Sequence, residues 1–410
     1  MSQLAIKGGS AAAEPLKQVK WPKLYPEDEA AVLQALRQGY WGGIGDEQSP
    51  NRKFERAFAD YHDAAYGTLV ANGTVSLELS LKTGGVRPGD EVIVPAITFI
   101  ASASAIVCVG AVPVFVDVDP DTCQISAAAI EAAISPKTRA IIAVHFGGYM
   151  ADMDAIVAVA NKHGLFVIED CAHAQGASWR GRRAGSWGEF GSFSFQESKA
   201  LSGGEGGIVL TNDAQLHEKA QLIRNIGRHT GQRAYNHYVP ATNWRLGGLQ
   251  AALLLSQFGK LPDQAEQRHR NALLLAEGVN RVEGLRSLPV DERLTQWGCY
   301  FFVIAFDAAA FGCSRDAFVQ ALRAEGVVWT TTGYNRPLYY EAAFSEEAMR
   351  PLLHESVPLP DYGQMRLPNA ERWATSMVTI LHYYLLGDRS GVDYILEAIH
   401  KVKQHVDELK

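Results

Sequence analysis

"RAIIAVHFGGYMADMDAIVAVANKHGLFVIED", residues 139–170, carries the pattern that decides the fold. The runs "RAIIAVHF" and "LFVIED" at its two ends are short and apolar, which is typical of strands buried on both faces. Between them, an acidic first turn after Asp152 and a glycine at Gly164 predict a helix that begins and ends near these residues. Strand, helix and strand in this order predict a parallel sheet covered by helices, with Asp170 at the end of the second strand.

The same alternation extends over the first two-thirds of the chain, and the pattern changes after about residue 260. A charged helix is predicted over 261–279, a strand over 299–306 and a closing amphipathic helix over 392–409. The chain is therefore predicted to be an α/β protein with two domains. A large domain, residues 1–262, holds the mostly parallel sheet, and a smaller α+β domain, residues 263–410, follows it.

Composition limits the classes of function. The chain has 410 residues, is 47% hydrophobic and 20% charged, and carries a formal net charge of −7, so it has no overall basic field for nucleic acid. Its five cysteines are scattered without CxxC spacing, which indicates neither a disulfide framework nor a zinc site. The N-terminus shows no signal peptide, and the longest charge-free stretch, 92–116, is interrupted by prolines and polar residues. We expect a cytoplasmic protein with no metal and no membrane partner.

One lysine stands in an unusual setting. The stretch "FSFQESKALSGGEGG", residues 193–207, places Lys199 shortly after two phenylalanines and before a run of glycines. A lysine acts as a nucleophile in its neutral form, and burial beside apolar side chains lowers its pKa toward that form. Phe193 and Phe195 are expected to provide this shielding. Lys199 is therefore a candidate nucleophile, with an ordinary solvated loop lysine as the alternative.

Two further residues are predicted at the same edge of the sheet. Asp170 follows a strand at the place where open α/β sheets bind their ligands. Its carboxylate suits a metal ligand, a base or the partner of a protonated ring nitrogen, and a helix N-cap is the ordinary alternative. Phe99, in "PAITFIAS", follows another strand, so its ring either stacks on a flat ligand or packs in the core.

Two segments are candidates for binding an anion. Asn72, Gly73 and Thr74 open a predicted helix, whose unpaired N–H groups and dipole attract a phosphate. Ser194 and the glycines after Lys199 offer a hydroxyl and close N–H groups, although the same glycines also suit an ordinary turn. "GGIGDE" does not follow a convincing strand, so a dinucleotide fingerprint is not indicated.

Together these motifs resemble the DegT/DnrJ/EryC1/StrS sugar aminotransferase family, a branch of the fold type I enzymes that use pyridoxal 5'-phosphate (PLP). The resemblance runs along nearly the whole chain, through "LAIKGG", "FERAFADYH", "NGTVSLELSL", "GDEVIVPAITFIASASAI", "DVDP", "ADMDAI" and "NWRLGGLQAALLLSQ". It implies PLP as cofactor and a large-domain sheet of the seven-stranded, mostly parallel type.

The resemblance also implies a role for each candidate residue. Lys199 matches the lysine that forms a Schiff base with PLP and then moves protons at the substrate carbon, and Asp170 matches the carboxylate that keeps the pyridine nitrogen protonated. Phe99 matches the ring-stacking position, and His173 lies where relatives contact the phenolic oxygen. The phosphate-binding positions match Gly73, Thr74 and Ser194, with Asn243, and Arg245 near it, delivered from the neighbouring subunit. A homodimer with active sites at the subunit interface is implied.

The retained lysine favours amino transfer, because sugar dehydratases of related fold carry histidine at that position. The resemblance implies a ping-pong reaction through Lys199, in which glutamine or glutamate donates the amino group to a keto-cyclitol or a keto-sugar. "HFGGYMADMD" and "FSFQESK" look nearest to the keto-cyclitol and aminohydroxybenzoate synthase branch. An aminohydroxybenzoate synthase-type dehydratase, a nucleotide-linked keto-sugar aminotransferase and a binding protein without turnover remain as alternatives. The loops 39–43 and 330–340 either border the acceptor pocket or serve as structural turns.

Overall fold

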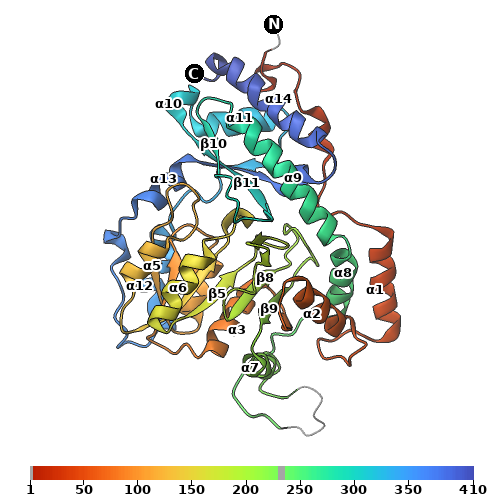
Figure 1. Cartoon of the computed structure of the whole chain (residues 1–410), viewed down its shortest axis with the longest axis vertical. Helices are drawn as coiled ribbons and strands as arrows, with labels where there is room; N and C mark the ends of the chain where they lie inside the picture. The colour runs from red at the N-terminus through yellow and green to blue at the C-terminus, as the bar shows by residue number, and fades with distance from the viewer. Residues whose placement is uncertain (1–2, 230–235) are drawn as a thin grey trace.

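The computed structural model describes residues 3–229 and 236–410 (Figure 1). Its strands are β1 (Tyr66–Val70), β2 (Glu91–Pro95), β3 (Val112–Val116), β4 (Thr138–Val144), β5 (Phe166–Asp170), β6 (Ser178–Trp179), β7 (Arg182–Arg183), β8 (Phe190–Ser194), β9 (Gly207–Thr211), β10 (Leu285–Ser287), β11 (Phe301–Phe306), β12 (Thr330–Thr331) and β13 (Met377–Leu381). Its α-helices are α1 (Pro26–Gln38), α2 (Pro50–Tyr61), α3 (Gly73–Gly84), α4 (Ala101–Cys108), α5 (Ala127–Ala133), α6 (Met153–His163), α7 (Ala214–Arg224), α8 (Gly248–Phe258), α9 (Leu261–Val279), α10 (Ala308–Phe311), α11 (Arg315–Ala324), α12 (Glu346–Met349), α13 (Pro368–Ser376) and α14 (Ser390–Gln404).

The large sheet confirms the predicted α/β class. Within the described residues it has seven strands in the order β1-β9-β8-β5-β4-β2-β3. The strands from β8 through β3 pair in parallel, whereas β9 pairs antiparallel with both of its neighbours. Because most strands point the same way, their carboxyl ends meet along one edge, where ligands of such sheets bind.

The decisive segment folds as predicted. β4 and β5 are almost entirely buried, as the apolar runs within them require. Asp152 caps α6 by accepting a hydrogen bond from the N–H of Ala155 at 3.1 Å. Gly164 ends the helix with φ +64°, a conformation that glycine adopts without strain. The second strand extends to Asp170 itself, two residues further than its apolar run.

The apolar stretch 92–116 folds as strand, helix and strand rather than as one long helix. It comprises β2 without its first residue, α4 and β3, all packed in the core of the large sheet. No helix in the described residues is long and apolar enough to cross a membrane.

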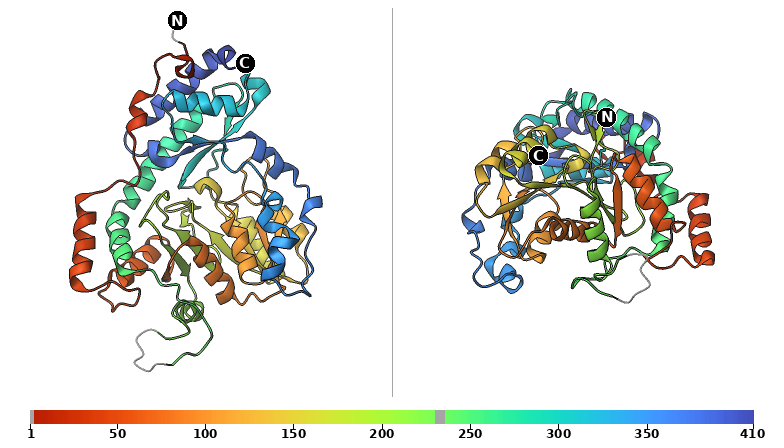
Figure 2. Two further views of the ribbon diagram at one scale, coloured as in Figure 1. Left: turned by 180° about the vertical axis from the view of Figure 1, so that it is seen from behind. Right: turned by 60° about the horizontal axis from the view of Figure 1, so that its bottom comes forward.

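A second, antiparallel sheet, in the order β10-β11-β13-β12, lies at the end of the molecule that holds both termini (Figure 2). The long helix α9 leads to it from the large sheet (Figure 1). The first described residues pack here as well, because Leu4 N–H donates to Glu408 and Ala5 N–H donates to Glu325. The predicted boundary at residue 262 lies at the start of α9, and the division into two domains stays a prediction.

Candidate active site

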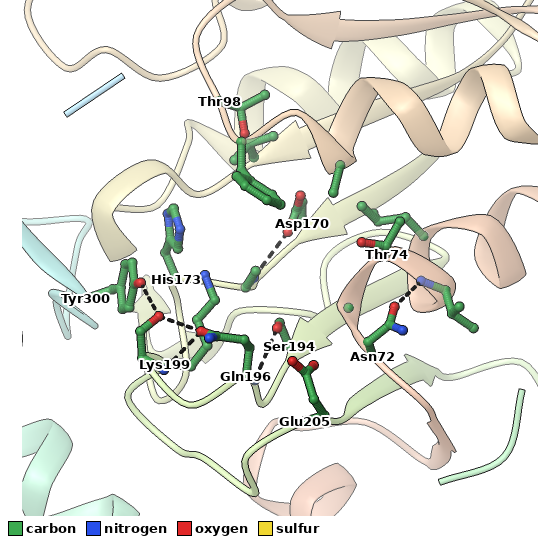
Figure 3. Close-up of a pocket in the computed structure, with 18 of the residues that line it drawn as sticks. Asn72, Thr74, Thr98, Asp170, His173, Ser194, Gln196, Lys199, Glu205 and Tyr300 are labelled. Carbon is green, nitrogen blue, oxygen red and sulfur yellow. Dashed lines mark hydrogen bonds between the residues drawn. The ribbon is translucent and has the colours of Figure 1, made fainter. Parts of the chain in front are cut away.

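A cavity of about 790 Å³ opens where β5 ends, between the first turn of α3 and the turn after β8. The predicted residues that line it are Gly73, Thr74, Phe99, Asp170, His173, Ser194 and Lys199. Figure 3 shows Lys199, His173 and Tyr300 on one side of the cavity and Asn72 and Thr74 on the other, with Asp170 between them. The predicted residues, which span 126 positions from Gly73 to Lys199, thus converge on one space, as expected for the edge of a parallel sheet.

Asp170 is a buried carboxylate at the end of β5. Its Oδ2 accepts a hydrogen bond from Ser102 Oγ at 2.8 Å, and its Oδ1 accepts one from Ala172 N–H at 3.2 Å. Burial raises the pKa of Asp170, and the two hydrogen bonds partly oppose this effect because they favour the ionised form. The carboxylate is therefore held in one orientation and is ready to pair with a buried cation.

Lys199 is a partly buried amine on the turn between β8 and β9. Its Nζ lies 4.4 Å from the centroid of the Tyr300 ring. Burial lowers the pKa of Lys199 to about 8, and the nearby Asp170 carboxylate acts in the opposite direction. Burial thus has the larger effect, and a substantial fraction of the amine is neutral near pH 8, as nucleophilic and base chemistry require.

The predicted shielding of Lys199 by Phe193 and Phe195 is wrong. Both rings are fully buried on the other face of β8, where they pack edge-on against Phe58 at 5.0 and 5.2 Å. Successive residues of a strand point to opposite faces, so Ser194 faces the cavity and its two neighbours face the core. Tyr300 provides the aromatic cover instead.

His173 is stacked on Tyr300, with ring centroids 4.4 Å apart and an interplanar angle of 12°. The N–H of Gly147 donates to its Nδ1 at 3.4 Å. Burial, and secondly the charge of Lys199, hold the pKa of His173 well below its usual value, so the ring is neutral. With Nδ1 as acceptor, the proton resides on Nε2, which makes His173 a hydrogen-bond donor through that atom.

The first turn of α3 forms an anion cradle. Asn72 Oδ1 caps the helix by accepting from Val75 N–H at 2.9 Å, while the earlier N–H groups of a helix have no intrahelical acceptor. A Cβ at Gly73 would lie 2.6 Å from Cβ of Ser194, so a side chain there would fill the cradle. Ser194 and Thr74 supply hydroxyl groups to the same part of the cavity. This donor set fits a phosphate.

Phe99 and Asn243 lie in different environments. Phe99 lines the cavity with 53% of its surface exposed, so its ring is available to a flat ligand. Asn243 is exposed outside this cavity, where it forms an isolated β-bridge with Asn225. Arg245, its predicted companion, donates to Asn225 Oδ1 at 2.9 Å. The structure of one chain therefore does not bring Asn243 or Arg245 to the other predicted site residues.

The two predicted loops also differ. Tyr334, in the loop 330–340, lines the cavity because the following residues return to the large sheet, where Leu338 N–H donates to Ala96 O at 2.8 Å. The loop 39–43 contributes no residue to the described lining of this cavity, and Gly43 packs closely against Arg245.

Several residues in or beside the cavity were not indicated by the sequence. The most important are Ser102, which orients Asp170, and Tyr300, which covers Lys199 and His173. Ser102 follows Phe99 by three residues in "PAITFIASAS", so a helical turn after the strand end gave a usable signal. Tyr300 precedes a strand of the second sheet, and nothing in its local sequence indicated that it reaches the large sheet.

One buried cluster has the composition of a metal site. The ligand atoms of His145, Glu169 and Cys171 lie within 4.8 Å of one another. However, the Glu169 carboxylate accepts three hydrogen bonds from backbone N–H groups of residues 185–188 and pairs with His145 at 3.0 Å. His145 Nδ1 in turn accepts from Ala151 N–H. These hydrogen bonds account for the close approach of the three side chains without a metal, because they support the end of β5.

The fold and cavity thus define an α/β enzyme with a buried amine, an opposing carboxylate and a phosphate cradle. Residues 22–400 match the model of the DegT/DnrJ/EryC1/StrS aminotransferase family. The chain belongs to this family and is a PLP-dependent aminotransferase. The cavity has the features that PLP requires, because Gly73 leaves room for a phosphate at the first turn of α3 and Asp170 lies at the end of a strand, across the cavity from the Lys199 amine.

Full-length relatives carry more specific names. A putative L-glutamine:3-amino-2,3-dideoxy-scyllo-inosose aminotransferase of Streptoalloteichus tenebrarius is 38% identical over 421 residues, and the match covers 100% of both chains. An L-glutamine:2-deoxy-scyllo-inosose aminotransferase of Micromonospora echinospora is 37% identical, again over 100% of both chains.

Solved structures show the same fold. The crystal structure of 3-amino-5-hydroxybenzoic acid synthase superposes with a TM-score of 0.84 at 32% identity, covering 95% of this chain and 98% of that one. A putative sugar aminotransferase of Streptococcus pneumoniae, solved in its PLP form, gives a TM-score of 0.81 at 25% identity, with coverage of 95% and 98%.

Proposed function

We propose that this enzyme transfers the amino group of glutamine to the carbonyl carbon of a keto-cyclitol. The observation that carries the proposal is the similarity of 37–38%, over the whole chain, to aminotransferases named for glutamine and for scyllo-inosose derivatives. The charge and polarity of the cavity support the same acceptor class.

The cavity wall suits a small polar ring better than a nucleotide-linked sugar. Among the lining residues that the structure describes, Lys199 is the only lysine or arginine, whereas Glu78 and Glu205 add negative charge beside Asp170. A nucleoside diphosphate brings two further negative charges, which favour arginine or lysine partners. Hydroxyl and amide side chains, among them Thr98 and Gln196, instead match the hydroxyl groups of a cyclitol.

Lys199 and Asp170 perform the central tasks in this proposal. PLP, when bound, supplies the electron sink that makes the α proton of glutamine acidic. The neutral Nζ of Lys199 accepts this proton and later returns a proton to the former carbonyl carbon of the acceptor. The Asp170 carboxylate, oriented by Ser102, pairs with the protonated ring nitrogen.

The remaining predicted residues bind and orient. With PLP bound, His173 would donate from Nε2 toward the phenolic oxygen, and Phe99 would stack on the ring. The first turn of α3, with Gly73 and Thr74, holds the phosphate together with Ser194. Asn243 completes the phosphate site from the second subunit of a homodimer, which agrees with its exposed position outside its own cavity. We place the enzyme in the cytoplasm and its domains at residues 1–262 and 263–410.

A second candidate rests on a specific likeness. 3-Amino-5-hydroxybenzoic acid synthase gives a TM-score of 0.84, so a PLP-assisted dehydration and aromatisation is the alternative reaction. The two activities require different products from the same cavity, and a product assay separates them.

The test compares three substrates in the presence of PLP and glutamine: the acceptors 2-deoxy-scyllo-inosose and a nucleotide-linked keto-sugar, and an aminated dehydroshikimate-type substrate for the dehydration. We expect aminated product from the inosose. A parallel reaction with glutamate in place of glutamine compares the two amino donors. Product from only the nucleotide-linked sugar, or only an aromatic product, would overturn the proposal. A Lys199→Ala variant serves as the matched negative control.

A further inference from the structure

The turn that carries Lys199 is held in an unusual way. Residues 195–206 connect β8 to β9 without forming a helix or strand. Three successive carbonyl oxygens in this turn, those of Ser198, Lys199 and Ala200, each accept a hydrogen bond from a side-chain N–H group. Carbonyl oxygens withdrawn from water need hydrogen-bond partners, and here none of the three partners comes from a neighbouring residue.

The three donors come from distant parts of the chain. His382, in the turn after β13, donates from Nε2 to Ser198 O at 3.1 Å. Trp21, which precedes α1, donates from its indole Nε1 to Lys199 O at 3.2 Å. Arg268, on α9, donates from Nη2 to Ala200 O at 3.0 Å.

The donors also support one another. Arg268 Nε donates to His382 Nδ1 at 3.3 Å, which leaves the imidazole proton on Nε2, where it meets the Ser198 carbonyl. The Trp21 ring packs edge-on against His382 with centroids 4.7 Å apart. Arg268 and His382 are both fully buried, so neither has space to adopt another orientation.

Arg268 has an environment that a purely structural role does not explain. In the described part of the chain it forms no ion pair with a carboxylate, and its Nη1 has no hydrogen-bond partner. A buried guanidinium without a counter-charge is costly, and residues of this kind persist where they serve another purpose. Its contacts lead to the Lys199 turn, both directly and through His382.

We propose that Trp21, Arg268 and His382 are positioning residues, which fix the backbone of residues 198–200 so that Nζ of Lys199 is directed at the reacting carbon. The inference rests on the proposed role of Lys199, and it adds the N-terminal segment and the second sheet to the catalytic apparatus. Since each donor acts through a carbonyl oxygen, loss of one loosens the turn without removing any group from the cavity wall.

The test uses Trp21→Phe, which keeps an aromatic ring beside His382 and removes only the indole N–H. The first readout is the pH profile of Lys199 acylation by acetic anhydride in PLP-free protein, followed by mass spectrometry. The native midpoint should lie near the Lys199 pKa of about 8, and the variant's midpoint should move upward because a looser turn admits water. The second readout is the maximal single-turnover rate with glutamine, which should fall about three- to tenfold with little change in glutamine affinity.

Trp187→Phe is the matched control, because this indole N–H also donates to a backbone carbonyl, that of Arg182 at 3.4 Å, in another turn. If Trp21→Phe does not fold, a second pair of variants tests the same proposal. His382→Gln retains an N–H donor, and His382→Leu does not. The proposal is supported if the acylation pH profile and the single-turnover rate change in Trp21→Phe and His382→Leu. Both should stay native in Trp187→Phe and His382→Gln. Native behaviour in Trp21→Phe, equal effects in Trp187→Phe, or equal effects of the two His382 variants overturn it. Acylation needs no acceptor, so its result is independent of the keto-cyclitol assignment.

Discussion

Replacing Lys199 with methionine should make the PLP-free protein more stable at neutral pH. The lysine is partly buried in the cavity wall, and burial lowers its pKa from the ordinary value of 10.5 to about 8. The folded protein therefore binds the lysine proton less tightly than the unfolded chain does. Methionine has a similar length and carries no charge, so it removes this cost while filling the same space.

The magnitude follows from the two pKa values. One pKa unit corresponds to about 1.36 kcal/mol, so the lowered pKa of Lys199 costs roughly 3 kcal/mol of folding free energy. This full cost applies below about pH 8, where the lysine of the unfolded chain is charged. As the pH rises from about 8 toward 10.5, the unfolded lysine also loses its proton, and the cost declines to below about 1 kcal/mol at pH 10. The stabilisation by Lys199→Met should therefore be large at pH 7 and small at pH 10.

The assay is urea unfolding of both PLP-free proteins at the same protein concentration, followed by circular dichroism at pH 7 and at pH 10. The difference in unfolding free energy between variant and native protein should fall by about 2 kcal/mol between the two pH values. Lys137→Met, which removes an exposed lysine, should change the unfolding free energy by less than about 0.5 kcal/mol at either pH. A Lys199→Met protein less stable than native at pH 7, or a difference that does not depend on pH, would refute the reasoning.

Three further predictions concern the other site residues. Gly73→Ala places a methyl group 2.6 Å from Cβ of the serine that ends β8, so PLP affinity measured by equilibrium dialysis should fall at least about tenfold, and unchanged affinity would contradict the cradle. Ser102→Ala removes the hydroxyl that donates to Asp170 and lowers its pKa, so the half-reaction with glutamine should slow about three- to tenfold in stopped-flow absorbance, whereas a native rate would show that the hydroxyl is dispensable. Finally, Asn243→Ala and Lys199→Met chains can be mixed, unfolded and refolded together. If each site uses Asn243 of the second subunit, this refolding should restore about a quarter of native activity. No recovery of activity would exclude the shared site.

The large sheet was predictable because its signals are local. Within residues 139–170, the strand runs, the acidic first turn after Asp152 and the stop at Gly164 each stand within a few residues of the structure that they specify. The position of Asp170 followed from the same pattern, because a parallel strand presents its last residue at the ligand-binding edge. The sequence predicted the end of this strand at Glu169 and Asp170, and both residues are paired in the sheet although they are charged.

The cavity was predictable only in part. The sequence indicated that Lys199 is shielded, but alternation along β8 places Ser194 toward the cavity and both phenylalanines toward the core. The actual cover, Tyr300, lies about a hundred positions along the chain, and its Oη meets Ser198 Oγ at 2.7 Å. Such a contact depends on how the second sheet packs on the first, which no local pattern encodes.

Burial acts on the two central groups of the cavity in opposite senses, and bound PLP would resolve this conflict in the proposed reaction. Burial lowers the pKa of Lys199 and raises that of Asp170, so in the PLP-free protein both groups are driven toward their neutral forms. The proposed chemistry needs Lys199 neutral but Asp170 ionised, and only a cation placed beside the carboxylate reverses the effect of burial on Asp170. Lys199 supplies such a charge only when it is protonated. A protonated Lys199 cannot accept a proton and therefore cannot act as the proposed base. A protonated ring nitrogen satisfies Asp170 without this conflict, so binding of PLP should offset part of the folding cost of the cavity by mass action. The predicted stability gain of Lys199→Met would then equal the cost of keeping a reactive amine in the cavity for the proposed reaction.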